Sequence, residues 1–224
     1  MTDAVTGERD PDLLDRYRAL RSAQVSDCLD QVGIRDNAMA ARLRPLYPTA
    51  RLAGYAMTIR LEVVHEVPDD QSLWYQGELE AIDGLQPGEV VVVSTCPGPI
   101  WGELLATASR ARGAVGIVAD AGVRDVVQLT EMQFPTFTSL IHPADGLGRA
   151  DVTARQVPVE CGDVTVSPGD IVVADADGIV VVPAAVSGEV LRLAEKKAAT
   201  EDIVRDELAR GDSVREVFRR HGVL

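Results

Sequence analysis

The sequence predicts an α/β protein whose elements pack as a β/β/α layered sandwich, for two reasons. The middle of the chain alternates strand, helix, strand and helix, which is typical of a βαβ unit with parallel strands. The final third holds short Val-rich segments separated by Gly, Pro and Asp turns, which favours antiparallel or barrel-like packing. Because no repeat, linker or charge block divides the 224 residues, we expect a single domain over residues 1–224.

The first half of the chain supplies three predicted elements. Apolar residues at helical spacing predict a helix over residues 13–32, which Gly33 ends. Residues 52–67 are rich in Val, Ile and Thr and are expected to be extended, with a bulge at Gly54. Residues 72–84 have helical character.

The middle of the chain gives the clearest pattern. A Pro87–Gly88 turn introduces a buried strand over residues 89–93, and a loop over residues 97–99 follows. We predict a helix over residues 101–112 that ends at Gly113, and then a strand over residues 116–119. The residues Asp120, Ala121 and Gly122 predict a turn, and residues 123–132 a short helix.

The last third changes character. Short strands are expected over residues 157–159, 163–166, 170–174 and 178–182. A long, highly charged helix over residues 187–210 and a small helix over residues 214–221 complete the chain.

Composition excludes several classes of protein. Hydrophobic residues make up 46% and charged residues 25%, as in ordinary globular proteins, and the net charge of −13 disfavours a nucleic-acid partner. The cysteines Cys28, Cys96 and Cys161 match no zinc or disulfide spacing. Residues 1–11 are polar, and apolar runs such as residues 179–183 are too short to span a bilayer. We therefore predict a cytoplasmic protein with no membrane partner.

The candidate site lies where two predicted parallel strands end. Ligands collect at the carboxyl ends of such strands, and the loops there run into helices at Glu103 and Asp125. Glu103, Arg124 and Asp125 should therefore lie close together beside two helix N-termini. The amides of Leu104 and Leu105 suit a substrate carboxylate, because the first turn of a helix has unpaired N–H groups.

These side chains are of the kinds that bind a divalent metal ion and an anionic substrate. Arg124 offers a planar fork for a carboxylate or an enolate oxygen, and Asp125 and Glu103 are hard oxygen ligands of the kind that Mg²⁺ or Mn²⁺ accepts. A plainer interpretation stays open. An acid in the first turn of a helix often only complements the helix dipole, and an Arg–Asp pair is often a solvated surface pair.

Several segments in order resemble the regulator of ribonuclease activity A-like superfamily, which includes the 4-hydroxy-4-methyl-2-oxoglutarate / 4-carboxy-4-hydroxy-2-oxoadipate aldolases. The likeness covers nearly the whole chain. Its motifs are Ser26-Asp27-Cys28-Leu29-Asp30-Gln31-Val32-Gly33, Gly54-Tyr55-Ala56-Met57-Thr58, Gly102-Glu103-Leu104-Leu105-Ala106-Thr107-Ala108, Ala121-Gly122-Val123-Arg124-Asp125 and Gly169-Asp170-Ile171-Val172-Val173-Ala174-Asp175-Ala176-Asp177-Gly178. The fold that we predict is of the swivelling-domain type.

The resemblance implies a role for each site residue. Asp125 would be the direct ligand of Mg²⁺ or Mn²⁺, Glu103 would hold metal-bound water, and Arg124 would contact the pyruvyl oxygen. Gly102 and the amides of Leu104 and Leu105 would bind the substrate carboxylate. Glu201, from the C-terminal helix of an adjacent subunit, would also act through water, so the resemblance implies a homotrimer or hexamer. This chain has Glu103 where the aldolases have Asp.

The function that follows is a class II aldolase, a carbon–carbon lyase that cleaves a 4-hydroxy-2-oxo acid to pyruvate and a second carbonyl product. Oxaloacetate decarboxylation is an expected side activity, because it passes through the same enolate. A lyase or decarboxylase for a different 2-oxo acid, and a non-catalytic regulator that binds and inhibits a partner enzyme such as a ribonuclease, are the alternatives. The regulators have Gly at the position of Glu103 and an acid at that of Gln128, which favours the enzyme. Trp74, Tyr75 and Trp101 are candidates for the distal pocket.

Overall fold

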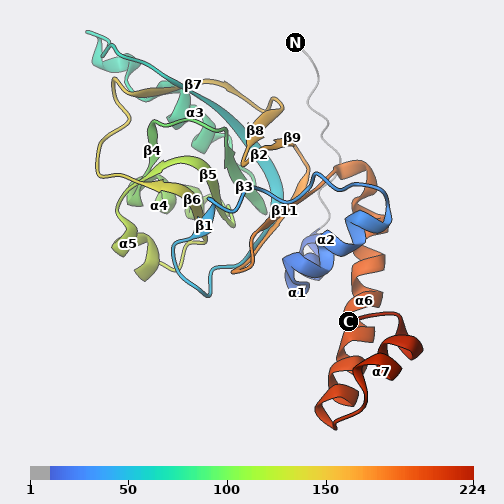
Figure 1. Cartoon of the computed structure of the whole chain (residues 1–224). Helices are drawn as coiled ribbons and strands as arrows, with labels where there is room; N and C mark the ends of the chain where they lie inside the picture. Colours follow the sequence, from blue (N-terminus) through green and yellow to red (C-terminus); the bar gives the residue numbers. More distant parts are fainter. Residues whose placement is uncertain (1–10) are drawn as a thin grey trace.

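The computed structural model describes residues 11–224, so the expectation for the segment before Pro11 lies outside the described residues. The chain has a mixed α/β fold built on one curled sheet that resembles half of a barrel (Figure 1). The strand order is β1 (Arg44–Pro45), β6 (Thr136–Ile141), β5 (Gly116–Val123), β3 (Glu89–Val93), β2 (Leu52–Val63), β10 (Ile171–Ala174) and β11 (Ile179–Val182). In addition, β4 (Pro99–Trp101) pairs with β5, and β7 (Ala150–Arg155) pairs with β2. Strands β8 (Val159–Cys161) and β9 (Val164–Val166) form a separate hairpin.

Seven α-helices and two short 3₁₀ helices surround the strands in the described part of the chain. They are α1 (Pro11–Ala19), α2 (Ser22–Gln31), η1 (Gln71–Leu73), α3 (Gln76–Asp83), α4 (Glu103–Ala111), α5 (Val126–Glu131), η2 (Ala184–Val186), α6 (Ser187–Ala209) and α7 (Val214–His221). Figure 1 shows α6 and α7 extending away from the sheet, on the side remote from α4 and α5.

The layers follow from the alternation of side chains along buried strands. On β3, Val91 and Val93 pack in the apolar cluster that includes residues of α3, α4 and α5, whereas Val90 and Val92 pack in the cluster that includes the β8–β9 hairpin. A third cluster joins α1, α2 and α6 to β10 and β11. The predicted β/β/α layering is therefore confirmed, with the hairpin and the helices α3–α5 on opposite faces of the sheet.

The central pairings are parallel and the outer ones antiparallel. Strands β3 and β5 pair in parallel, as the βαβ pattern predicted, and β2 and β6 extend this parallel part of the sheet on either side. The short strands of the last third pair antiparallel, as predicted, in the β10–β11 and β8–β9 hairpins. Strands β1, β4, β6 and β7 were not predicted. Residues 97–99 were expected to form only a loop, but the β4–β5 pairing begins at Pro99.

The single helix predicted over residues 13–32 is wrong. The chain is extended at Arg21, with φ −91° and ψ 149°, and this break separates α1 from α2. A distant residue holds it in place, because Asp175 accepts hydrogen bonds from both the amide (2.8 Å) and the hydroxyl (2.6 Å) of Ser22. A contact across 153 residues overrides the local helical pattern.

The turn predicted at Asp120, Ala121 and Gly122 is also wrong, because β5 continues to Val123. Neighbouring strands pair with this extension on both sides, and Gly122 lies opposite Pro99 of β4 and Leu140 of β6. A Cβ atom on Gly122 would lie 2.9 Å from the Cα of Pro99, so the glycine permits close strand packing rather than a turn.

The bulge predicted at Gly54 is absent as well, since Gly54 pairs in regular register with Val172. Glycine at this position again allows two backbone segments to lie close together, because a Cβ atom on Gly54 would lie 2.8 Å from the carbonyl oxygen of Gly88. The register shift of β2 falls between Arg60 and Leu61, opposite β7.

Candidate active site

The two strand ends that the sequence singled out do meet, and a cavity of about 230 Å³ lies beside them. Its walls come from the start of α3, from β4, from the start of α4, from the loop after β5 and from residues 144–146. Five of the predicted site residues belong to this site region: Gly102, Leu104, Leu105, Arg124 and Asp125 line the cavity.

The carboxylate of Asp125 lies against the N-terminus of α4. Its Oδ2 accepts a hydrogen bond of 3.0 Å from the backbone N–H of Glu103. Gly102 makes this approach possible, because a Cβ atom on Gly102 would lie 2.6 Å from the same oxygen. Asp125 has a left-handed backbone, with φ 58° and ψ 38°, a conformation that Asp and Asn tolerate better than most residues.

Arg124 lies between two carboxylates. Its Nε is 3.8 Å from Oδ2 of Asp125, and its Nη1 is 3.9 Å from Oδ1 of Asp145. Both distances are too long for hydrogen bonds, so the guanidinium N–H groups that line the cavity are available to bind a ligand.

The side chain and the backbone of Glu103 have different surroundings. The backbone N–H donates a hydrogen bond to Asp125, whereas the side-chain carboxylate accepts one of 2.8 Å from the hydroxyl of Thr107, one turn later in α4. Glu103 is not among the described residues that line the cavity. Its role in holding metal-bound water stays a prediction.

The first turn of α4 presents donors to the cavity. The first backbone bond within the helix runs from the amide of Ala106 to the carbonyl of Gly102, at 3.1 Å. The amides of Leu104 and Leu105 precede it and have no backbone acceptor in the described part of the chain. Both residues line the cavity, so this helix end can bind a carboxylate.

Glu201 lies elsewhere within the chain. On α6, its carboxylate accepts a hydrogen bond of 2.6 Å from the side chain of Gln24 and forms an ion pair of 3.2 Å with Lys197. These contacts join α6 to α2, and Glu201 does not line the cavity of its own chain. Its predicted role in an adjacent subunit stays a prediction.

The cavity contains two acidic residues that the sequence did not single out, Glu78 and Asp145. Glu78 is only 6% exposed. Burial raises the pKa of Glu78 to about 8, and the negative charges of Asp145 and Asp151 add to this effect against the opposing charge of Arg124. A signal was available, because Glu78 shares the buried face of α3 with Ala81 and Ile82 at helical spacing.

Tyr75 and Asp145 form a short hydrogen bond on the cavity wall. The hydroxyl of Tyr75 donates to Oδ2 of Asp145 at 2.6 Å. This bond raises the pKa of Tyr75 to about 12. Burial alone would raise the pKa of Asp145. The hydrogen bond from Tyr75, the hydrogen bonds from two backbone amides and the positive charge of Arg124 outweigh burial and lower this pKa below its usual range. Asp145 is therefore a carboxylate at neutral pH.

Of the three aromatic residues expected near the distal pocket, Tyr75 and Trp101 line the cavity. Trp101 is buried and stacks on Phe134 with ring centroids 6.3 Å apart. Trp74 is not on the cavity wall, and its indole N–H donates to the carbonyl of Pro68 at 2.8 Å.

The donor set fits a lightly held divalent ion. No group of three or more His, Cys, Asp or Glu side chains suited to a metal occurs among residues 11–224. Mg²⁺ needs no such group, since it keeps several waters and binds through one or two carboxylates together with a ligand. Asp125, whose side chain is 39% exposed, can supply such a carboxylate beside the cavity.

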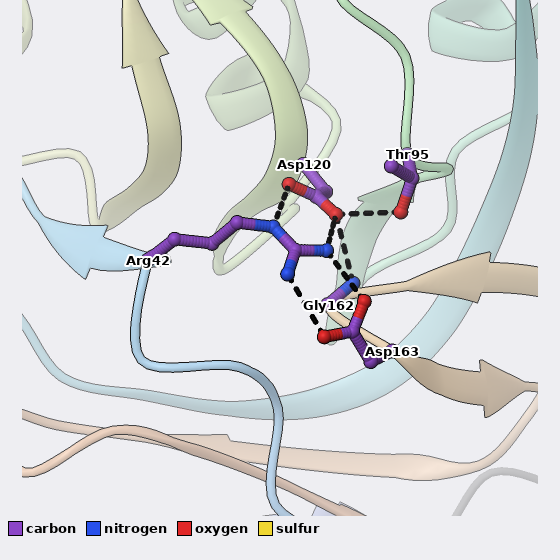
Figure 2. Close-up of polar contacts among 5 residues, drawn as sticks. All are labelled: Arg42, Thr95, Asp120, Gly162 and Asp163. Atoms are coloured by element: carbon purple, nitrogen blue, oxygen red, sulfur yellow. Dashed lines mark hydrogen bonds and ion pairs between the residues drawn. The ribbon is translucent and has the colours of Figure 1, made fainter.

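Asp120, which the sequence pattern placed in a turn, belongs to a separate polar cluster (Figure 2). Its carboxylate accepts hydrogen bonds from Arg42 (2.7 and 3.1 Å), from the hydroxyl of Thr95 (2.5 Å) and from the amide of Gly162 (3.1 Å). Arg42 also pairs with Asp163 at 2.8 Å. Although burial opposes ionisation, these bonds lower the pKa of Asp120 to about 2. The cluster joins β5 to the β8–β9 hairpin.

None of the helices in the described part of the chain is both long and apolar enough to cross a membrane.

Comparison with known proteins places the site in context. A family model described as RraA-like, Aldolase/RraA, matches residues 22–181. A protein of Halalkalibacterium halodurans named "Putative 4-hydroxy-4-methyl-2-oxoglutarate aldolase" is 28% identical over 198 residues, which cover 85% of this chain and 86% of that protein.

Two solved structures share the fold. An uncharacterised protein from Pseudomonas syringae pv. tomato superposes with a TM-score of 0.80 at 26% identity, covering 93% of this chain and 97% of that one. Streptomyces coelicolor RraAS2, described as an unusual member of the RNase ES inhibitor RraA protein family, gives a TM-score of 0.77 at 26% identity, covering 89% and 100%.

Proposed function

Because the chain belongs to the RraA-like family of aldolases and RraA proteins, we propose that it is a class II aldolase. It cleaves a 4-hydroxy-2-oxo acid to pyruvate and a second carbonyl compound, and it depends on Mg²⁺ or Mn²⁺. One observation carries this proposal: Asp125, Arg124 and the free amides of α4 border the same cavity.

Each of these groups has a task in the reaction. The amides of Leu104 and Leu105 bind the C1 carboxylate of the substrate, and Arg124 donates to the C2 oxygen. When the C3–C4 bond breaks, its electron pair goes to the pyruvyl fragment, and the proton of the C4 hydroxyl goes to a base. Negative charge then develops on the C2 oxygen, where the guanidinium stabilises it. Protonation at C3 completes pyruvate.

Asp125 would hold the divalent ion directly, and Glu103 would hold it through water. When bound, the ion acts as a Lewis acid on the 2-oxo group. The hydrogen bond from the Glu103 amide and the contact with Gly102 fix the Asp125 carboxylate at the cavity before any ion binds. Such preorganisation lowers the cost of forming the site.

The proposal includes an assembly. Glu201 of an adjacent subunit would contribute to the site through water, so the active species would be a homotrimer or hexamer. Light scattering measures the mass of the species, and a monomer with full activity would exclude this part of the proposal.

The proposed function is tested by a partial reaction that needs only the pyruvyl half of the substrate. Pyruvate in D₂O should exchange its methyl protons in the presence of the protein and Mg²⁺ or Mn²⁺, as followed by NMR. EDTA and Asp125→Ala should each abolish the exchange. Pyruvate release from oxaloacetate should show the same dependence, since it passes through the same enolate.

A second candidate function rests on the likeness to RraAS2, whose description names an RNase ES inhibitor family. In that case the chain binds a partner enzyme and has no lyase activity. Exchange that is absent, or that EDTA leaves unchanged, would exclude the aldolase and favour this regulator.

A further inference from the structure

The buried carboxyl group of Glu78 has no partner within its own chain. The residue is only 6% exposed, and its side chain makes no hydrogen bond or ion pair with any of residues 11–224. Buried polar groups are nearly always hydrogen-bonded, so an unpaired one calls for an explanation. Because Glu78 lines the cavity of the proposed active site, a molecule bound in that cavity can supply the missing partner.

We propose that Glu78 is the base that removes the proton of the C4 hydroxyl when the C3–C4 bond of the substrate breaks. This inference rests on the proposed function and names the residue that accepts this proton. It applies to any 4-hydroxy-2-oxo acid, whatever its distal group.

The fold places the Glu78 carboxyl beside the other groups of the site. Its Oε1 lies next to Gly146, since a Cβ atom on that glycine would be 3.4 Å from this oxygen. Gly146 directly follows Asp145, whose Oδ1 is 3.9 Å from Nη1 of Arg124. In the proposed reaction the C1 carboxylate binds to α4 and the C2 oxygen to Arg124. The carbons beyond C2 then extend towards the walls formed by α3 and residues 144–146, where Glu78 lies.

The position of Glu78 is fixed by its own chain. Helix α3 lies against β7 so closely that a Cβ atom on Gly77 would be 2.6 Å from the carbonyl oxygen of Val152. A single subunit already buries the Glu78 side chain. An adjacent subunit therefore has access only to the small part that stays open, and the occupant of the cavity remains the natural partner of the carboxyl.

Among the three acidic side chains in the described lining of the cavity, Glu78 is the one suited to accept a proton. Asp125 is the proposed ligand of the divalent ion. Asp145 already accepts a hydrogen bond of 2.6 Å from the hydroxyl of Tyr75, and such bonds lower the pKa of Asp145 and make it a weak base. Glu78 receives no such bond, and burial raises its pKa to about 8.

A divalent ion on Asp125 would lower the pKa of each carboxyl group in the cavity. The difference between Glu78 and Asp145 remains, because it comes from burial and from hydrogen bonds within the chain. The charged groups of the chain that act on Glu78 are Asp145 and Asp151, which raise its pKa, and Arg124, which lowers it. The positive charge of an ion would add to that of Arg124 and increase the fraction of Glu78 that is ionised and ready to accept a proton.

In the proposed step, the ionised Glu78 takes the proton of the C4 hydroxyl, and the C4–O bond becomes a carbonyl. The electron pair of the C3–C4 bond moves to the pyruvyl fragment and forms its enolate. C3 of the enolate then takes a proton from water. Glu78 returns its own proton to water, which regenerates the carboxylate.

Oxaloacetate separates this base from the rest of the site, because its decarboxylation breaks the C3–C4 bond without removing a hydroxyl proton. We would measure kcat/KM for pyruvate release from oxaloacetate and from two hydroxy acids, 4-hydroxy-4-methyl-2-oxoglutarate and 4-hydroxy-2-oxopentanoate. In Glu78→Gln, the ratio of hydroxy acid cleavage to oxaloacetate decarboxylation should fall at least about 10²-fold, since a general base contributes about 10²–10⁴-fold.

Two further variants sharpen this test. Glu80→Gln is the matched control and should leave the ratio unchanged, since Glu80 also lies on α3 but pairs with Arg155 and does not line the cavity. Glu78→Asp keeps a carboxyl group and should retain more of the ratio than Glu78→Gln. The melting temperature of each variant shows that it is folded.

The outcomes separate the inference from the function. A ratio that Glu78→Gln leaves unchanged, including an equal loss of both reactions, overturns the inference and assigns Glu78 at most a structural role. A wild type that exchanges the methyl protons of pyruvate but cleaves neither hydroxy acid overturns it as well. If pyruvate does not exchange and no substrate releases pyruvate, the proposed function fails and the inference fails with it.

Discussion

The carboxylate of Asp125 and the backbone amide of Glu103 are joined by a hydrogen bond of 3.0 Å that links the loop after β5 to the first turn of α4. The two residues come from successive strand–helix connections of the same sheet. This bond brings a carboxylate beside the amides of Leu104 and Leu105, which have no backbone acceptor among the described residues. The geometry of the proposed site therefore depends on an interaction that involves a main-chain group.

Substitution of Gly102 should impair the proposed active site and leave the stability of the fold nearly unchanged. The backbone there is extended, with φ −156°, so alanine is tolerated by the backbone, but its Cβ would lie 2.6 Å from Oδ2 of Asp125. We expect Gly102→Ala to lower the rate of pyruvate proton exchange at least about tenfold, because misplaced catalytic groups are costly. The melting temperature should change little.

Gly188→Ala is the matched control for this prediction, since a Cβ atom on Gly188 meets nothing within 4 Å. Unchanged exchange in Gly102→Ala would show that the close approach of Gly102 to Asp125 does not matter for activity.

Replacement of Arg124 by lysine should impair the reaction more than binding. Lysine keeps the charge but loses the planar fork, and the loss of one donor to a developing oxyanion costs about 10²–10³-fold in kcat. Steady-state kinetics of pyruvate release would measure this loss. A variant with wild-type kcat would show that Arg124 does not stabilise the transition state.

Glu78 should make stability depend on pH. Its pKa in the folded protein, about 8, lies above the ordinary value of 4.5, so the folded state retains a proton that the unfolded chain loses. Stability should fall as the pH rises from about 4.5 to 8 and then level off. Glu78→Gln should remove this fall and be more stable than the wild type at pH 9, because the amide carries no charge that burial would desolvate.

Urea unfolding at pH 5, 7 and 9 would test this prediction, with Glu80→Gln as the control. Parallel stability curves for the wild type and Glu78→Gln would show that the Glu78 carboxyl is ionised at neutral pH in the folded protein.

The polar cluster around Asp120 should contribute to the free energy of unfolding and not to activity. Arg42→Ala removes two hydrogen bonds to a buried carboxylate, and we expect a loss of about 1–3 kcal/mol in the free energy of unfolding. Because the pKa of Asp120 is lowered, its stabilising contribution is present above pH 3.8 and is lost as the pH falls towards about 2.

Urea unfolding at pH 7 and pH 3 would measure the Arg42→Ala effect. Arg44→Ala is the control, because Arg44 is exposed and, among residues 11–224, its side chain donates only to the carbonyl of Asp177. An equal effect of both variants would contradict the special role of the Arg42 contacts.

The sequence predicted the site residues that lie just after the ends of parallel strands. The rule that ligands collect where parallel strands end led to Arg124 and Asp125, and both line the cavity. The turn predicted at Asp120 was wrong, because β5 continues past it, and the Asp120 carboxylate is held by Arg42 in the cluster of Figure 2.

The residues on the other walls of the cavity could not be predicted from the positions where parallel strands end. Asp145 lies between β6 and β7, two strands that the sequence pattern did not reveal, and only the fold brings it within 3.9 Å of Arg124. The break between α1 and α2 was equally hidden, since it depends on Asp175, 153 residues later in the chain than Ser22. Local patterns predict elements, but long-range contacts decide their ends.

The left-handed backbone of Asp125 restricts what mutation can place at this position. Of the twenty amino acids, glycine, asparagine and aspartate adopt φ near 58° with least strain, and only aspartate of these three is charged. A change from aspartate to asparagine needs one nucleotide in the codon. It would keep the shape of the loop while removing the charge, so a single step would take the proposed metal ligand away and leave the fold unchanged.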